Sequence, residues 1–434
     1  MKTSHQAIFE TCVWGLLLEL TLLLFANITN MDRTKPLTTF LFYLPFALFT
    51  LAFIRLTRIT TKNTKATVFL ILFFSSLFTL TFIRDRPNLS DDLYRYYWDG
   101  KVSYNGINPY IFPPESQSLA HLRDEYWNLI NNKDLTTPYP PFIEALFATL
   151  YLLSPSIYSY KLLAAITYIA SSYILLLILG KCGKSLYYSL LYSWNPLMVI
   201  EFGHSGHNDS VAVLWMLLSI FFLLTNKYSA SAATLGIATL SKIFPIFLTP
   251  FYATKWGIKN TILYVSIIIL PYLPLSLKGS VQTSLIAYFE RIAFNSGAYY
   301  LVEKTFAYFA PANPMFYARI TVSILFIISL LYLTKRPTKV SSLYAAYMAI
   351  TLYLIFTPTV QPWYLSWVLP FAALYTTKPW LYFSGAIFLS YYTYTLPEIS
   401  PGFWPEQLWV RVVEYVPFFY LLIRSFKVRE FEGH

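Results

Sequence analysis

The sequence predicts an all-α polytopic membrane protein, and three observations lead to this class. Of the 434 residues, 56% are hydrophobic and only 12% are charged, and the mean hydropathy is +0.50, so the chain is too apolar for a soluble domain. Apolar runs long enough to cross a bilayer as a helix recur along it. Tyr and Trp gather at the ends of these runs, where aromatic rings settle at the headgroup level. We expect a single integral membrane domain, residues 1–434, with about 11 to 13 transmembrane helices.

The net charge and the cysteines exclude other classes of protein. The formal net charge is +11, but the basic residues fall singly or in small groups between the apolar runs and form no continuous patch. We therefore assign them to membrane topology and expect no nucleic-acid partner. Cys12 and Cys182 lie in or beside predicted spans, so they imply neither a disulfide framework nor a metal cluster.

Three apolar runs open the chain, at residues 8–30, 37–55 and 66–83. Basic residues lie between the second and third runs: Arg55, Arg58, Lys62 and Lys65. By the positive-inside rule this cluster is cytoplasmic, which places the N-terminus inside and sends the third span outward. Residues 84–157 then form a long outer loop that carries surface helices, including the short aromatic run 139–153, which begins with two prolines.

The later runs continue the same alternation across the membrane. They lie at 158–180, 185–200, 210–226, 229–253, 260–276, 315–334, 341–358, 362–377, 379–395 and 408–426. Basic residues between them place the C-terminus in the cytoplasm and a second polar loop, 201–209, on the outer side of a plasma or inner membrane. The run 229–253 is interrupted near Lys242 and Pro245, which predicts either a broken or re-entrant helix pair or a single kinked span.

Polar chemistry concentrates in the outer loop, between residues 90 and 110. Asp91, Asp92 and Asp99 lie there, close to an apolar run that ends near residue 83. A carboxylate beside a bilayer core is costly unless it is paired or hydrated, so these acids are candidate functional residues. The alternative is that Ser90 or Asp91 only caps a surface helix, where a negative charge favours the positive end of the helix dipole.

A helix beginning here would sort these acids by their spacing. Asp92, Tyr96 and Asp99 would share one face, and Asp91 would lie over Arg95 one turn later. We therefore expect Arg95 to neutralise Asp91, which leaves the other carboxylate free to act as a general base.

The second polar loop contains two histidines and an aspartate. His204, His207 and Asp209 lack the ligand spacing of a structural zinc centre, although a metal site is one possible interpretation. We favour histidines that bind an anionic group or orient a substrate. The remaining interpretation is that these polar residues cap the helix that starts near Asp209.

Further candidates lie in the second half of the chain. Lys242 is a cation inside an apolar segment, which suits a phosphate ligand or, alternatively, a side chain that extends to the interface. Arg291 either pairs with Glu290 at the surface or binds phosphate. The segment from Gln361 through Trp363 to Tyr364 is either an interfacial aromatic anchor or the wall of a binding site.

Several short motifs, taken together, resemble a known family. They are the Asp91–Asp92 pair with Tyr94 and Tyr96, the segment Gly106-Ile107-Asn108-Pro109-Tyr110, the helix start Tyr139-Pro140-Pro141, the segment Gly206-His207-Asn208-Asp209, the Lys242 and Pro245 break, and the segment Phe294-Asn295-Ser296-Gly297. In this order they resemble the polyprenyl-phosphate-mannose-dependent mannosyltransferases of the glycosyltransferase C superfamily. The chain departs from the pattern at Gln361, where many relatives have His before Pro-Trp-Tyr.

The resemblance implies both a fold and a reaction. The fold would be a glycosyltransferase-C-like bundle whose long first outer loop is catalytic. The reaction would move a sugar, expected to be mannose, from a polyprenyl-phosphate donor to a lipid or glycan acceptor on the outer face, with inversion. It would require no cofactor, and a divalent metal is not favoured. Its partners would be the donor, the acceptor and membrane lipids.

The resemblance also implies roles for particular residues. The spacing of the family motif falls on Asp92 as the general base, with Asp91 as the second candidate. The expected donor-phosphate ligands are His204, His207, Lys242, Arg291 and Arg95. The expected substrate-binding residues are Tyr96, Trp98, Asp99, Asn108, Tyr110, Asp209, Asn295, Gln361, Trp363 and Tyr364.

Three other functions remain open on the sequence. A lipid or glycolipid transporter or flippase also has broken helices and buried charge, but its important acids would lie in several spans near the midplane. Here the acids gather in outer loops. A surface-glycan polymerase or ligase would share the lipid-linked donor and differ in using a diphosphate-linked oligosaccharide. A non-catalytic subunit of a glycan-assembly complex would tolerate substitution of Asp92.

Overall fold

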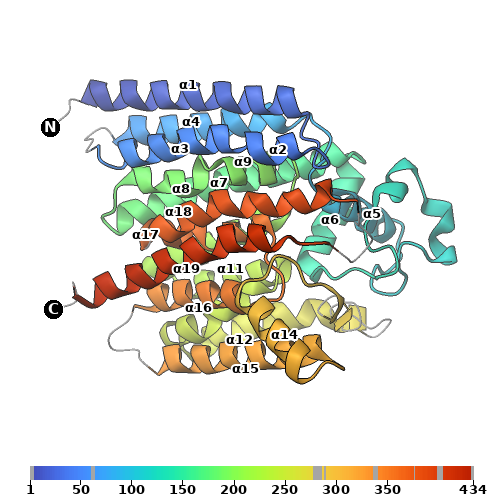
Figure 1. Cartoon of the computed structure of the whole chain (residues 1–434). Coiled ribbons are helices and arrows are strands. Elements are labelled where there is room, and N and C mark those ends of the chain that lie inside the picture. The colour runs from blue at the N-terminus through green and yellow to red at the C-terminus, as the bar shows by residue number, and fades with distance from the viewer. Residues whose placement is uncertain are drawn as a thin grey trace.

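The computed structural model describes residues 4–59, 64–276, 286–287, 290–335, 341–375, 377–397 and 404–431. In these ranges the regular structure is helical, apart from an isolated β-bridge between Phe294 and Thr359. The long helices run side by side in one bundle, with both chain ends at one end of it (Figure 1). The opposite end carries α5 (Asp92–Tyr104) and α6 (Pro141–Leu153). The predicted all-α polytopic class is confirmed.

Six helical segments of the described chain are long and apolar enough to cross a membrane. Large apolar side chains on them face outward, such as Leu16, which is 60% exposed, and this suits contact with lipid. The segments are α1 (Ser4–Thr29), α2 with α3 (Pro36–Leu41 and Tyr43–Leu56), α4 (Thr64–Phe82), α7 (Ile157–Lys181), η4 with α12 (Phe244–Leu248 and Thr249–Ser276) and α15 (Pro314–Thr334).

The other apolar runs give shorter or broken helices, where the sequence predicted about 11 to 13 crossings. Prolines explain several of the breaks, because proline favours the first turn of a helix and cannot continue one. Pro196 starts α9 and Pro362 starts η5 in this way. The shorter elements are η3 (Leu186–Ser189), α8 (Leu190–Ser193), α9 (Pro196–Gly203), α10 (Asp209–Leu224), α14 (Ala298–Phe309), α16 (Ser342–Phe356), η5 (Pro362–Trp367), α17 (Leu369–Leu374), α18 (Thr377–Ala386) and η6 (Ile387–Thr395). The chain closes with α19 (Leu408–Phe431).

The predicted interruption of run 229–253 is confirmed. Helix α11 (Tyr228–Ser241) ends at Lys242, whose backbone is extended with φ −155° and ψ 146°, and η4 begins two residues later. Because Pro245 lies at the start of η4 and lacks a backbone N–H, it cannot extend α11 through this point. The break turns the Lys242 side chain away from the helix axis of α11.

Helices α5 and α6 pack closely and form a second apolar core at the end of the bundle opposite the chain ends. Loop segments between them contain η1 (Gln117–Leu122) and η2 (Glu125–Leu129). The Tyr96 ring stacks on Phe147 of α6 with centroids 4.9 Å apart. A small residue makes the approach possible, because a Cβ built on Gly100 would lie 2.5 Å from the Phe147 carbonyl oxygen.

The predicted pairing of Arg95 with Asp91 is wrong. Arg95 Nε instead donates to both carboxylate oxygens of Asp99, at 2.8 and 2.9 Å. Both side chains are buried, at 5% and 3% exposure. Asp91 is unavailable to Arg95 because its carboxylate accepts from the Arg33 guanidinium at 2.7 Å. The i to i+4 spacing allowed either partner, and the contact with Arg33 decides between them.

A second buried carboxylic acid lies beside this pair. Thr137 Oγ1 donates to Glu144 Oε1 at 2.6 Å. Burial, and then the neighbouring Asp99 carboxylate, raise the pKa of Glu144 well above its usual range. The protonated form of Glu144 is therefore favoured, and it fixes the loop that contains Thr137 against α6.

We expect Gly100→Ala to lower stability by about 1–3 kcal/mol, because the new methyl group would overlap the Phe147 carbonyl and the Tyr160 hydroxyl, 2.5 and 2.4 Å away. Thermal unfolding of detergent-solubilised protein measures the effect. The matched control is Gly180→Ala, whose Cβ would have its nearest neighbour, Leu186, at 3.9 Å. Equal melting temperatures for the two variants would contradict the close packing of α5 on α6.

We expect the melting temperature of the Glu144→Gln variant, relative to that of the wild type, to increase as the pH rises. An acid whose pKa is raised by folding binds more protons in the folded state, so the wild type loses stability as the pH rises above about 4.3, the ordinary carboxyl pKa, toward the folded pKa. The glutamine variant lacks this loss. Thermal unfolding from about pH 5 to pH 8 tests the trend.

The Glu125→Gln substitution, at an exposed position, is measured beside Glu144→Gln as the control. If Glu144→Gln instead lowered the melting temperature equally at every pH, the proton on Glu144 would have no role.

Candidate active site

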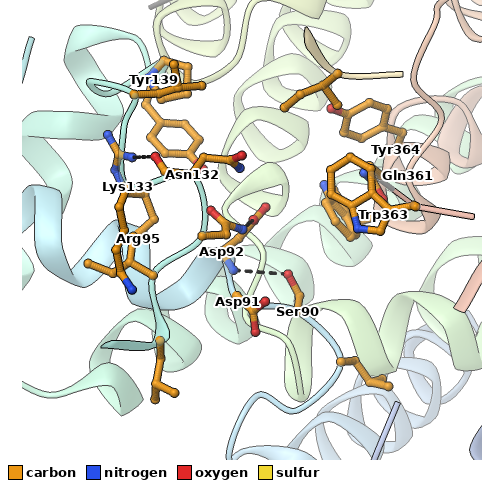
Figure 2. A pocket seen from close by; sticks show the side chains of 18 of the residues that line it. Ser90, Asp91, Asp92, Arg95, Asn132, Lys133, Tyr139, Gln361, Trp363 and Tyr364 are labelled. Atoms are coloured by element: carbon orange, nitrogen blue, oxygen red, sulfur yellow. Dashed lines mark hydrogen bonds between the residues drawn. The ribbon is translucent and has the colours of Figure 1, made fainter. Parts of the chain in front are cut away.

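A cavity of about 960 Å³ lies at the end of the bundle that carries α5 and α6. One wall is the loop before α6 together with Arg95 and Tyr139, and the opposite wall is the start of η5 (Figure 2). Asp92 lies between the two walls (Figure 2). Seven of the predicted site residues line the cavity: Asp91, Asp92, Arg95, Lys242, Gln361, Trp363 and Tyr364.

Asp92 is the first residue of α5 and faces the cavity. One carboxylate oxygen, Oδ1, accepts from the Asn131 amide at 3.0 Å. The other, Oδ2, lies 4.0 Å from His207 Nε2, and the side chain is 24% exposed. Ser90 Oγ accepts from the Asp92 backbone N–H at 3.3 Å. The carboxylate is therefore oriented by one neutral donor, the Asn131 amide, is reachable from the cavity and lies at the N-terminus of α5.

Asp91 also lines the cavity, but its charge is matched. Its carboxylate accepts from Arg33 at 2.7 Å, and Asp91 makes no side-chain capping bond to α5. The Arg33 guanidinium also donates to the Leu89 carbonyl at 3.1 Å and lies 4.3 Å from the centre of the Tyr394 ring. Arg33 was not among the predicted site residues, and it lies 58 residues before its partner. Its position directly after the first apolar run was the available signal.

Lys242 reaches the cavity from the break between α11 and η4. Its Nζ donates to Asp209 Oδ2 at 3.0 Å, and Asp209 is fully buried. Asp209 Oδ1 accepts from the Trp367 indole at 2.7 Å. The ammonium also lies 5.8 and 5.9 Å from the ring centres of Tyr139 and Tyr364. Asp209 therefore does not line the cavity but fixes the cation that does.

Aromatic side chains form the wall opposite Arg95. Tyr364 stacks on Trp367 with centroids 4.0 Å apart, and Trp363 stacks on His207 at 3.7 Å. Gln361 lies beside Trp363 and Tyr364 (Figure 2). The sequence left two interpretations of this segment, and its position on the cavity favours a binding wall over a surface anchor.

His204 and His207, the two histidines predicted to bind phosphate, are buried, and neither lines the cavity. Burial lowers the pKa of His204 to about 4, and its Nε2 accepts from the Asn88 backbone N–H at 3.1 Å. His204 is therefore neutral and already bonded, which does not fit the predicted phosphate ligand. His207 does not fit it either, because its ring is enclosed by Trp363, Ser90 and Glu201.

A glycine places His207 in this position. Gly206 has φ +71°, a conformation that favours glycine, and a Cβ there would lie 2.9 Å from Leu93 Cδ1 of α5. The turn between α9 and α10 thus packs directly on the start of α5. Glu201 was not among the predicted site residues, although a carboxylate next to an apolar run is a signal of function.

The other predicted residues support the cavity rather than line it. Arg291 pairs with Asp134, which does line the cavity. Tyr96, Trp98 and Asp99 of α5 are buried. Asn108 Oδ1 accepts from the Tyr110 backbone N–H at 3.0 Å, and the Tyr110 hydroxyl donates to the Tyr139 carbonyl. Asn295 is buried near the β-bridge of Phe294.

In the part of the chain that the structure describes, no group of three or more His, Cys, Asp or Glu side chains is arranged to bind a metal ion. Among the charged side chains that line the cavity, Arg33, Asp91, Arg95 and Lys242 are held in ion pairs.

Comparison with known proteins provides the family. No curated protein matches the chain. Residues 12–258, more than half of the chain, match the family model described as "alpha-(1->6)-mannopyranosyltransferase, N-terminal domain". The match covers α5, α6, Asp209 and Lys242, and it confirms the predicted relationship to the glycosyltransferase C mannosyltransferases. The chain therefore belongs to the alpha-(1->6)-mannopyranosyltransferase family and is a multi-pass membrane glycosyltransferase.

Proposed function

We propose that the protein transfers mannose, with inversion, from a polyprenyl-phosphate donor to a hydroxyl group of a lipid or glycan acceptor, with Asp92 as the general base. The observation that carries this proposal is the position of the Asp92 carboxylate in a cavity that also presents the Lys242 ammonium and an aromatic wall. We further propose that this end of the bundle is the outer face. In support, the chain ends lie at the opposite end, where the sequence predicts the cytoplasm (Figure 1).

The proposed reaction needs one base. Asp92 takes the proton of the acceptor hydroxyl as its oxygen attacks the anomeric carbon from the side opposite the phosphate. The bond from that carbon to the phosphate oxygen breaks, and the phosphate leaves with the electron pair. A phosphate leaving group needs electrostatic stabilisation more than protonation, so no second carboxylic acid is required, in contrast to the carboxylate pair of most glycosidases.

Lys242 is the proposed ligand of the departing phosphate. Asp209 holds its ammonium at 3.0 Å, and the buried indole of Trp367 in turn holds Asp209 at 2.7 Å. A cation that is already oriented stabilises developing negative charge without further reorganisation. Arg95 lines the cavity on the wall that faces the start of η5, and Asp99 holds its guanidinium in the same way. It is the second proposed phosphate ligand.

The lining of the cavity suggests how the two substrates are arranged. Ile243, Phe244 and Tyr353 contribute an apolar part next to Lys242, which suits the first units of a prenyl chain. Asn131 and Asn132 belong to the outer loop and contribute amides near Asp92, which suits a hydroxyl-rich acceptor. Tyr364 and Trp363 offer aromatic faces on which a sugar ring can stack.

We expect Asp92→Asn to lower kcat by about 10²-fold or more, because it removes the general base and keeps the shape of the side chain. Transfer of labelled mannose from a synthetic polyprenyl-phosphate donor into membrane lipid or glycan measures it. Asp91→Asn is the matched control and should retain most activity, since Asp91 is paired with Arg33. If Asp91→Asn abolished transfer and Asp92→Asn did not, Asp91 would be the base. A wild type that moves lipid across vesicles but transfers no sugar would instead support a transporter.

We expect Lys242→Gln to lower kcat/KM for the donor by about 10²-fold, because the phosphate loses an oriented cation. The substitution also strands the Asp209 carboxylate, so the double variant Lys242→Gln with Asp209→Asn is measured beside it. If the loss came only from the stranded charge, the double variant would recover. Lys133→Gln, on the polar side of the same cavity, is the control and should have a much smaller effect.

A further inference from the structure

We propose that Ser90, His207 and Glu201 form a proton relay that accepts from Asp92 the proton taken from the acceptor hydroxyl. This inference rests on the proposed function of Asp92 and adds to it the residues that return the base to its ionised form. Ser90 lines the cavity just before α5, whereas His207 and Glu201 lie behind the cavity, in the turn after α9 and on α9 itself. We call the three residues the relay.

From Asp92, successive contacts lead to Ser90, then to His207 and then to Glu201. The Asp92 backbone N–H donates to Ser90 Oγ at 3.3 Å. Ser90 Oγ lies 3.0 Å from His207 Nε2, and His207 Nδ1 lies 3.0 Å from Glu201 Oε2. The Tyr391 hydroxyl donates to Glu201 Oε1 at 2.8 Å. A carboxylate beside Nδ1 favours the tautomer that carries its proton there, so we assign the lone pair of Nε2 to the Ser90 hydroxyl.

The same nitrogen faces the proposed base. His207 Nε2 lies 4.0 Å from Asp92 Oδ2, on the side of Asp92 that does not contact Asn131. A proton on Oδ2 therefore lies close to Nε2, and the Ser90 hydroxyl already contacts that nitrogen at 3.0 Å. In the proposed step an O–H bond of Asp92 breaks and an N–H bond forms at Nε2, either directly or through exchange of the Ser90 hydroxyl proton.

Burial explains why the charge is stable after the transfer. His207 and Glu201 are both fully buried, and an imidazolium formed there remains beside the Glu201 carboxylate. A buried charge is costly when it stands alone and much less so beside an opposite charge. Neighbouring His204 does not compete for the proton, since its Nε2 is bonded to the Asn88 N–H. Only a proton moves, so no oxidant or further reactant is needed, and the proton returns to water in the cavity by way of Ser90 and Asp92 after the product has left.

A structural role is the alternative, because His207 also stacks on Trp363 of the cavity wall at 3.7 Å. The two roles differ in kinetics. Loss of the stacking contact would disturb the wall and raise the donor KM. Loss of the relay would slow turnover without changing donor binding, because none of the relay's ring or carboxylate atoms lines the cavity. Glu201 separates the roles further, since its carboxylate lies beside His207 and Tyr391 and does not line the cavity.

The experiment compares wild type, His207→Gln, Glu201→Gln and Ser90→Ala in the labelled-mannose assay, with kcat and donor KM measured separately. The relay predicts that His207→Gln and Glu201→Gln each lower kcat by about tenfold or more and leave the donor KM within about twofold. Ser90→Ala should lower kcat as well, and Ser90→Thr, which keeps the hydroxyl, should restore part of it. Thermal unfolding of each variant checks that it is folded.

The control variant is His204→Gln, a buried histidine of the same turn whose ring is hydrogen-bonded to the Asn88 backbone N–H instead of to Ser90. It should keep the wild-type kcat. An unchanged kcat in both His207→Gln and Glu201→Gln, with Asp92→Asn inactive, would overturn the relay and leave the base in place. A raised donor KM with unchanged kcat in His207→Gln would also overturn it in favour of the structural role. Wild type that transfers no sugar would overturn the proposed function and the relay with it.

Discussion

A charged side chain that is buried away from water needs an oppositely charged or hydrogen-bonding partner, and this requirement determines how the side chains around the cavity are arranged. Each ionised side chain around it that is largely buried lies beside an opposite charge or a hydrogen-bond donor. The pairs are Arg33 with Asp91, Arg95 with Asp99 and Lys242 with Asp209, and the buried Glu201 accepts from the Tyr391 hydroxyl. Asp92 differs from the paired acids because its closest donor is the neutral amide of Asn131. The chemistry proposed for Asp92 depends on the matched charges around it.

The pairing also explains which parts of the site were predictable. Asp92 and Lys242 were assigned from short motifs that resemble those of a family, and both line the cavity. Their partners were not predictable from spacing, since Lys242 and Asp209 lie 33 residues apart and come from different helices. Where spacing did apply, it allowed two answers: Arg95 has a carboxylate four residues away on either side, and the structure uses Asp99.

The fold was predictable to the extent that hydropathy determines it. Apolar runs such as 8–30 and 158–180 became α1 and α7 almost residue for residue, because a bilayer requires one length and one composition of a spanning helix. Runs 185–200 and 362–377 have the same composition but form short pieces. Proline marked the breaks, but which pieces reach the cavity follows from contacts between distant segments, as with Trp367 and Asp209.

The proline-broken segments also bear on how the protein assembles. A continuous apolar helix satisfies its own backbone hydrogen bonds and can enter a bilayer alone, as α1, α4 and α7 can. Short pieces such as η5 leave backbone groups exposed at their ends, which lipid cannot satisfy. They must therefore dock against helices already in the membrane. The aromatic wall on η5 would then form late in biogenesis, so an enzyme competent for transfer exists only after the last third of the chain has been inserted.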